Sequence, residues 1–169
     1  MDRLAKEAAV ENGPIVYDKM PKEVLLTQQK ENGLQMWQRQ WTDTEKGAVT
    51  KAFFPSVRNR IRQKIPVFPE LTTMLIGHGK IRSYLYRFGL TNNAMCPCEE
   101  EEETVDHLIF KCKKLNKNRN EMIKQIKNNG GNWPTSNETL VNNYLNFFVT
   151  FVKSIDFTDL QRGFALKGG

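Results

Sequence analysis

Apolar residues along most of this chain recur every three or four positions, which is the spacing of an amphipathic helix. Residues 21–41 carry apolar side chains at mostly helical spacing, and Pro21 suits the first turn of a helix. The same pattern covers residues 80–88 and 113–128, and glycines follow both segments. The pattern predicts a mainly α-helical fold.

The widest apolar face is expected near the end of the chain. Thr135 to Glu138 resembles a capping box, and apolar residues then recur at helical spacing from Val141 to Ile155. This spacing predicts one long helix whose aromatic residues Phe147, Phe148 and Phe151 lie in the core, with docking of a protein partner as the alternative. Polar residues interrupt the segment, so it is not expected to span a membrane.

The length and the net charge of the chain limit the classes of function that it can have. The chain has 169 residues and a mass of 19.6 kDa, which corresponds to about one domain and excludes a complete polymerase. Its 25 Lys and Arg residues against 19 Asp and Glu residues give a net charge of +6. Such a surplus points to nucleic acid or another anionic partner, although it also keeps proteins soluble. Residues 1–13 lack an apolar run, so we expect no secretory signal and an intracellular location.

All three cysteines of the chain lie in one short segment with one of its two histidines. Cys96, Cys98, His107 and Cys112 form the pattern C-x-C-x8-H-x4-C, and thiols with imidazole are the ligands of a tetrahedral structural zinc site. Two cysteines on one turn can reach the same ion, and His107 and Cys112 are expected on one face of a short helix. The pattern predicts bound Zn²⁺. Ordinary core residues and a redox pair are the alternatives.

Two segments near the cysteines are interpreted without a role in binding. Gly77-His78-Gly79 could let a backbone approach a ligand closely, but a turn between two helices is the simpler interpretation. The run Glu99–Glu103 is expected to be a solvated loop between the two pairs of ligands. Its charge would repel phosphates locally.

Short motifs follow one another from Trp37 to Cys112. They are Trp37, Trp41, Gly47, Thr50, Phe53-Phe54-Pro55, Gly77-His78-Gly79, Tyr84-Leu85, Arg87-Phe88, Cys96, Cys98, Glu103-Thr104, His107 and Cys112. In this order they resemble the C-terminal region of insect-type non-LTR retrotransposon reverse transcriptases. In that family the polymerase and an RNase H domain precede a region that ends in a CCHC zinc knuckle. The resemblance implies a region that helps to hold template RNA or target DNA.

The first residues resemble another part of the same polyproteins. The segment Met1–Ala9 reads MDRLAKEAA and is similar to the last helix of the RNase H domain, where Asp2 would match the fourth active-site carboxylate. A two-metal nuclease needs several carboxylates, and the other three are absent here. Asp2 is therefore interpreted as a relic, an acidic residue in the first turn of a helix. We expect no catalytic residue and no enzyme activity in this chain.

Basic residues with interleaved tyrosines suggest where nucleic acid would bind. Lysines and arginines neutralise phosphates, and aromatic rings stack on bases. If the helices pack around the zinc site, these side chains are expected to form one track. Ordinary solvated helix faces are the alternative. The candidate contacts are Lys80, Arg82, Tyr84, Tyr86, Arg87, Lys113, Lys114, Lys117 and Arg119.

Together these features predict a small helical domain built around a zinc knuckle. We divide the chain into residues 1–12 as the end of an RNase H domain, 13–45 as a connecting helix, 46–157 as the zinc-knuckle domain and 158–169 as a flexible tail. The predicted function is non-catalytic, zinc-dependent binding of RNA or DNA by a fragment of a retrotransposon polyprotein, in the nucleus. A protein-interaction module scaffolded by zinc and a genomic remnant without selected function are the alternatives.

Overall fold

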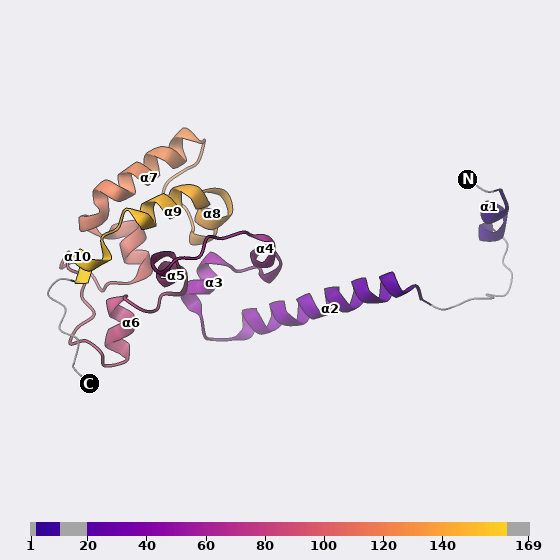
Figure 1. Ribbon diagram of the computed structural model, residues 1–169, viewed down its shortest axis with the longest axis horizontal. Coiled ribbons are helices and arrows are strands. Elements are labelled where there is room, and N and C mark those ends of the chain that lie inside the picture. The colour runs from indigo at the N-terminus through magenta and orange to yellow at the C-terminus, as the bar shows by residue number, and fades with distance from the viewer. Residues whose placement is uncertain (1–2, 11–19, 162–169) are drawn as a thin grey trace. The chain divides into compact units, whose positions relative to one another are not determined.

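Helices form both compact units of this chain. The computed structural model describes residues 3–10 and 20–161, and the units are Met1–Trp37 and Gln38–Gly169 (Figure 1). Within the described ranges no strand forms, and Met95 and Glu102 make an isolated β-bridge. The predicted mainly α-helical class is confirmed. The domain boundaries after residues 12 and 45 remain predictions.

The first unit contains α1 (Arg3–Val10) and most of α2 (Lys22–Asp43). α1 overlaps the segment that resembles an RNase H helix and ends one residue beyond it, whereas Asp2 lies outside the described residues. α2 buries no residue, and Trp37 is 51% exposed. Across the described parts of the chain, no helix is both long and apolar enough to cross a membrane.

The end of α2 is anchored to the helices that follow it. Trp41 Nε1 donates to the Phe54 carbonyl at 2.8 Å, between α3 (Ala48–Phe53) and α4 (Val57–Arg62). Gln38 Nε2 donates to the Pro55 carbonyl at 3.0 Å, and Gln38 Oε1 accepts the Val57 N–H at 2.8 Å. Trp41 and Gln38 therefore attach the end of α2 to the segment between α3 and α4.

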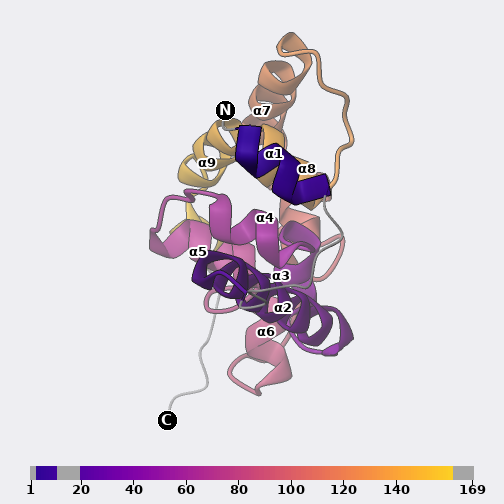
Figure 2. The same ribbon diagram turned by 90° about the vertical axis from the view of Figure 1, so that its right-hand side faces the viewer.

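The core of the second unit forms around α9 (Leu145–Lys153). This helix contacts α5 (Pro69–Ile76), α7 (Asn116–Asn128) and α8 (Asn137–Asn143), and it lies beside α7 in both Figure 1 and Figure 2. The Phe148 ring lies 5.6 Å from that of Phe53 and 6.4 Å from that of Phe151, centroid to centroid. Phe148 and Phe151 are core residues, as the sequence predicts, so these rings are not free to dock a partner.

The long last helix expected from the sequence is broken in two at Tyr144. This residue has φ −127° and ψ 27°, outside the α-helical region, and separates α8 from α9. Its ring packs against Gly131, where a Cβ would overlap the tyrosine side chain. Ser136, rather than Thr135, caps α8 by accepting the Thr139 N–H at 3.0 Å. The break thus falls at a residue that packs against a different segment of the chain, and helical periodicity does not reveal it.

The start of the predicted flexible tail is a packed helix. α10 (Phe157–Gln161) buries Phe157 and Leu160. The Leu160 carbonyl also accepts a hydrogen bond from Arg82 Nη2 at 2.8 Å. Residues 158–161 are therefore not a loose tail, because they continue the helix and Leu160 lies in the core. Residues 162–169 lie outside the described part of the chain.

Candidate metal centre and nucleic-acid interface

A tight turn positions the first two candidate ligands, Cys96 and Cys98. The Cys96 N–H donates to the Glu101 carbonyl at 2.9 Å, and the Cys96 carbonyl accepts the Glu99 N–H at 2.8 Å. Glu99 has φ 63°, the left-handed conformation that lets the chain reverse here. The backbone of this turn thus brings both cysteines to one side.

A single π-helical turn positions the other two candidate ligands. In η1 (His107–Lys111) the Cys112 N–H donates to the His107 carbonyl at 2.7 Å, five residues earlier. Residues five apart on an α-helix lie about 140° apart around its axis. The wider π turn returns Cys112 to the side of His107 instead, and turns of this kind are frequent at functional sites. The short helix expected here is present in π form.

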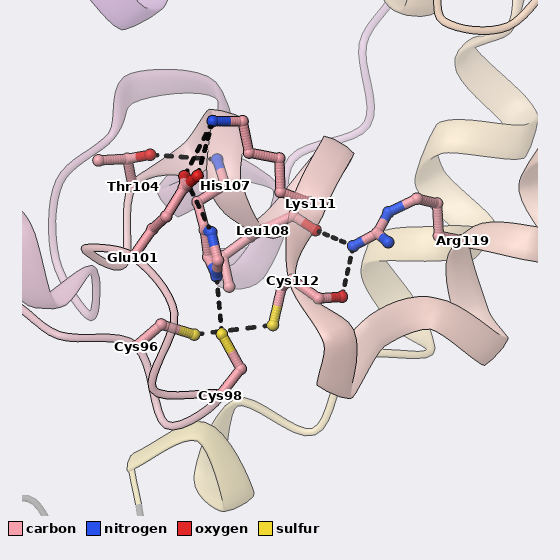
Figure 3. A network of polar contacts seen from close by, with 9 residues as sticks. All are labelled: Cys96, Cys98, Glu101, Thr104, His107, Leu108, Lys111, Cys112 and Arg119. Carbon is pink, nitrogen blue, oxygen red and sulfur yellow. Dashed lines mark hydrogen bonds and ion pairs between the residues drawn. The ribbon is translucent and has the colours of Figure 1, made fainter.

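The four side chains meet at one point (Figure 3). Their candidate ligand atoms all lie within 4.8 Å of one another. Cys96 Sγ is 3.6 Å from Cys112 Sγ, and Cys98 Sγ is 3.1 Å from His107 Nε2. Two sulfurs bound to one tetrahedral zinc ion would lie about 3.8 Å apart, given a Zn–S distance of about 2.3 Å. The structure brings together all four residues of the predicted set, and the donor atoms fit a metal ion such as zinc.

The environment of Cys112 favours the thiolate form. The hydrogen bond from the Cys96 thiol lowers the pKa of Cys112, and the backbone N–H groups of Leu115 and Lys114 act in the same direction. The same hydrogen bond, together with burial, raises the pKa of Cys96. Cysteine binds a metal as thiolate. The fold therefore stabilises one ligand of the candidate centre in its binding form.

Glu101 faces the far side of the His107 ring. Glu101 Oε2 lies 3.6 Å from His107 Nδ1, and Lys111 Nζ holds the same carboxylate at 2.9 and 3.0 Å. The Thr104 hydroxyl accepts the His107 backbone N–H at 3.1 Å. A carboxylate at Nδ1 favours a proton there and leaves Nε2 free to bind a metal. Lys111, Glu101 and His107 thus form a supporting chain around the candidate centre.

Replacing Glu101 with glutamine is expected to weaken zinc binding about tenfold, the lower end of the range for such supporting groups. Glutamine keeps the size of the side chain but loses the negative charge that faces His107. Competition with a chromophoric zinc chelator measures the affinity. The matched control is Glu102→Gln at the neighbouring exposed glutamate, and equal affinities of the two variants would contradict this role.

Arg119 is a structural residue of the candidate centre, and its predicted contact with phosphate is wrong. The side chain is 5% exposed. Its Nε donates to the Ile109 carbonyl at 2.7 Å, and its Nη2 donates to the carbonyls of Cys112 at 2.6 Å and Leu108 at 3.4 Å (Figure 3). The guanidinium thereby ties α7 to the π turn, and its donors face inward.

Arg82 is the second predicted phosphate contact that the structure contradicts. It is 8% exposed at the start of α6 (Arg82–Arg87), and its Nη1 donates to the Met95 carbonyl at 3.2 Å. Its Nε lies 3.6 Å from Glu103 Oε2. Burial raises the pKa of Glu103 to about 7, and Arg82 opposes this shift. The glutamate run is therefore not a simple solvated loop, because Glu101 supports His107 and Glu103 is buried.

The other predicted nucleic-acid contacts are accessible but form two groups. One group lies at α6, and the other lies just before and at the start of α7. Lys113 makes an ion pair with Glu100, which reduces its charge toward a ligand. The helices α6 and α7 lie at opposite ends of the second unit in Figure 1 and Figure 2, so the groups do not form one track along adjacent helices. Tyr84 is half-buried, and the exposed members are Lys80, Tyr86, Arg87, Lys113, Lys114 and Lys117.

The helices and the cysteine–histidine cluster define a small helical domain with a candidate metal centre. No family model and no solved structure matches the chain. The chain is similar to the retrovirus-related Pol polyprotein from type-1 retrotransposable element R1 of Bradysia coprophila, with 38% identity over 80 residues, 47% of this chain and 8% of that protein. The Pol polyprotein from element R1 2 of Nasonia vitripennis is 30% identical over 88 residues, 51% of this chain and 21% of that protein.

A further relative, from element R1 4 of Nasonia vitripennis, is 30% identical over 95 residues, 54% of this chain and 24% of that protein. These relatives confirm the resemblance to non-LTR retrotransposon polyproteins. The chain spans less than a quarter of the length of each of them. It is similar to a part of such a polyprotein, and the similarity does not assign the activities of the whole polyprotein to it.

Proposed function

We propose that this chain is a zinc-dependent, non-catalytic nucleic-acid-binding fragment of a retrotransposon polyprotein. The observation that carries the proposal is the convergence of Cys96, Cys98, His107 and Cys112 on one point. Three sulfurs and one imidazole suit zinc, whereas calcium and magnesium prefer oxygen ligands. Zinc, when bound, would supply a structural crosslink between the cysteine turn and the π turn. A retrotransposon polyprotein acts on RNA and DNA, so nucleic acid is the ligand that we propose for such a domain.

The basic side chains beside the candidate centre support binding to a phosphate backbone. Lys117 is exposed in the first turn of α7, and Lys113 and Lys114 are exposed in the 3-10 turn Lys113–Leu115 that joins the π turn to α7. Because Glu100 holds Lys113, we expect Lys114 and Lys117 to make the stronger phosphate contacts. The net charge of +6 favours association with either RNA or DNA. If the chain holds template RNA or target DNA, we expect it to act in the nucleus. This nuclear location stays a prediction.

Replacing Lys113, Lys114 and Lys117 together with glutamine is expected to weaken nucleic-acid binding and to flatten its salt dependence. Each lost phosphate contact should reduce the slope of log affinity against log salt by about 0.9 on duplex DNA. Fluorescence anisotropy with a labelled duplex, repeated over a range of salt concentrations, measures this slope.

The matched control removes three exposed lysines elsewhere, at Lys22, Lys30 and Lys46. It lowers the net charge by the same amount. The proposal fails if the native chain binds neither RNA nor DNA at low salt, or if its binding ignores salt. Equal losses in the two triple variants would contradict a localised interface at the start of α7.

A further inference from the structure

A row of aromatic rings lies outside the candidate metal centre, where the turn after α5 meets α6. The ring centroids of His78 and Tyr84 are 4.5 Å apart, and those of Tyr84 and Phe88 are 4.8 Å apart. The Arg87 guanidinium lies 5.5 Å from the Tyr84 centroid and 5.2 Å from the Phe88 centroid. His78 and Phe88 are exposed, so the row can be reached from solvent.

A cavity of about 240 Å³ opens beside this row. Its volume is below the range of about 300 to 1,000 Å³ that holds drug-sized ligands, so it suits a single planar ring. No aspartate or glutamate is among the described residues that line it. Its floor is partly apolar, and its lining includes Val49, Gly77, His78, Ile81, Tyr84 and Arg87.

The two glycines of the Gly77-His78-Gly79 turn shape this place. Gly77 has φ +69° and Gly79 has φ +75°, a conformation that glycine adopts without strain. A Cβ at Gly77 would lie 2.7 Å from a methyl carbon of Val49, so a side chain there would collide with the wall of the cavity. The turn therefore packs closely below His78 and presents its ring beside Tyr84.

We propose that this cavity binds one unpaired base of a single-stranded nucleic acid. The base would stack on His78 and Tyr84, which line the cavity, while Arg87 and the exposed Lys80 contact an adjacent phosphate. Aromatic platforms flanked by positive charge are the means by which proteins bind single strands without sequence preference. The inference rests on the proposed function and names its substrate class.

The chemistry of the cavity distinguishes this ligand from others. A cationic ligand would meet the positive charge of Arg87 without a lining carboxylate to offset it. The bases of a duplex are stacked and paired inside the helix, so their faces are not available to a ring on the protein. An unpaired nucleotide joins a planar aromatic base to a negative phosphate, and the cavity offers a stacking ring for the first and the positive charge of Arg87 for the second.

The test compares single-stranded and duplex binding in the zinc-loaded full chain. The probes are labelled oligo-dT of about 12 nucleotides, a length within the range bound by single-strand modules, and a duplex of the same length. The variant is His78→Ala combined with Tyr84→Leu, and the matched control is Trp37→Leu. Trp37 is a 51% exposed aromatic residue on α2 that does not line the cavity.

The double variant is expected to lose on the order of 5- to 100-fold in affinity for oligo-dT, the effect of removing one or two stacking contacts. The duplex affinity of the double variant, and both affinities of Trp37→Leu, should change little. If circular dichroism shows that the double variant is misfolded, His78→Ala alone decides the matter, since this exposed side chain lies outside the core. Photocrosslinking of 5-bromouracil probes should also label the segment of residues 78–88.

Two results would overturn the inference while the proposed function stands. One is unchanged oligo-dT affinity of the folded variant, and the other is an equal loss of single-stranded and duplex binding. A native chain that binds neither probe at low salt would instead remove the proposed function, and this inference with it.

Discussion

Chelation of zinc is expected to lower the free energy of unfolding of this chain by several kcal/mol and to unfold the segment between Cys96 and Cys112. Structural zinc binding in small peptides has an apparent free energy of about 10 to 16 kcal/mol at neutral pH, which is comparable to the stability of a whole domain. Cys96, His107 and Cys112 are buried together, and without a metal the fold must bury their polar atoms at a cost.

Native mass spectrometry should show one zinc ion per chain, and circular dichroism should show partial loss of helix when a chelator removes it. Cys112→Ser is expected to reproduce this loss without chelator, because it removes a buried ligand. The variant is its own control, since a chelator should then have no further effect on its melting. A native chain that carries no metal and melts identically with and without chelator would refute the zinc site.

Replacing Arg119 with methionine is expected to lower the free energy of unfolding by about 3 kcal/mol, even with zinc in excess. Methionine preserves much of the apolar volume of arginine but removes the guanidinium donor to the carbonyls of Ile109 and Cys112, of which Cys112 keeps only the Leu115 N–H at 3.2 Å. Arg119→Lys should not restore stability, because an ammonium group does not reproduce the planar fork that reaches several carbonyls at once.

Urea unfolding curves measure the effect of Arg119→Met. The matched control is Lys117→Met, which removes the same charge from an exposed position on the same helix. Surface substitutions usually change stability by less than about 0.5 kcal/mol. Equal midpoints of the two variants would show that the hydrogen bonds of Arg119 contribute nothing, and that its burial is incidental.

The sequence predicts the local features of this protein better than its distant contacts. The four candidate ligands lie within 17 consecutive residues, 96–112, so their spacing alone indicates that they can meet. The helix α7 covers most of the segment 113–128 whose apolar spacing predicts it. In contrast, Arg82 finds the Leu160 carbonyl 78 residues away, and no local pattern distinguishes it from an exposed arginine.

The charge of a single residue did not predict whether its side chain is exposed, buried or part of the site. Glu101 and Glu103 belong to one uninterrupted glutamate run, yet one supports His107 and the other is buried beside Arg82. Side chains on a turn diverge in direction, so neighbours of the same type reach different surroundings. Periodicity likewise misses the break at Tyr144, because the apolar spacing continues across a residue whose backbone is not helical and whose ring packs against Gly131.

The π turn between His107 and Cys112 has a consequence for how related sequences are aligned. An α-helical turn would carry its second ligand four residues after the first, as H-x3-C, whereas this turn holds one residue more and keeps both ligands on one side. A one-residue gap at this place in an alignment can thus mark a change of turn type with the metal site intact. Sequence patterns used to search for such knuckles should therefore accept both H-x3-C and H-x4-C. A pattern with only one spacing would miss proteins that differ from it by this one residue.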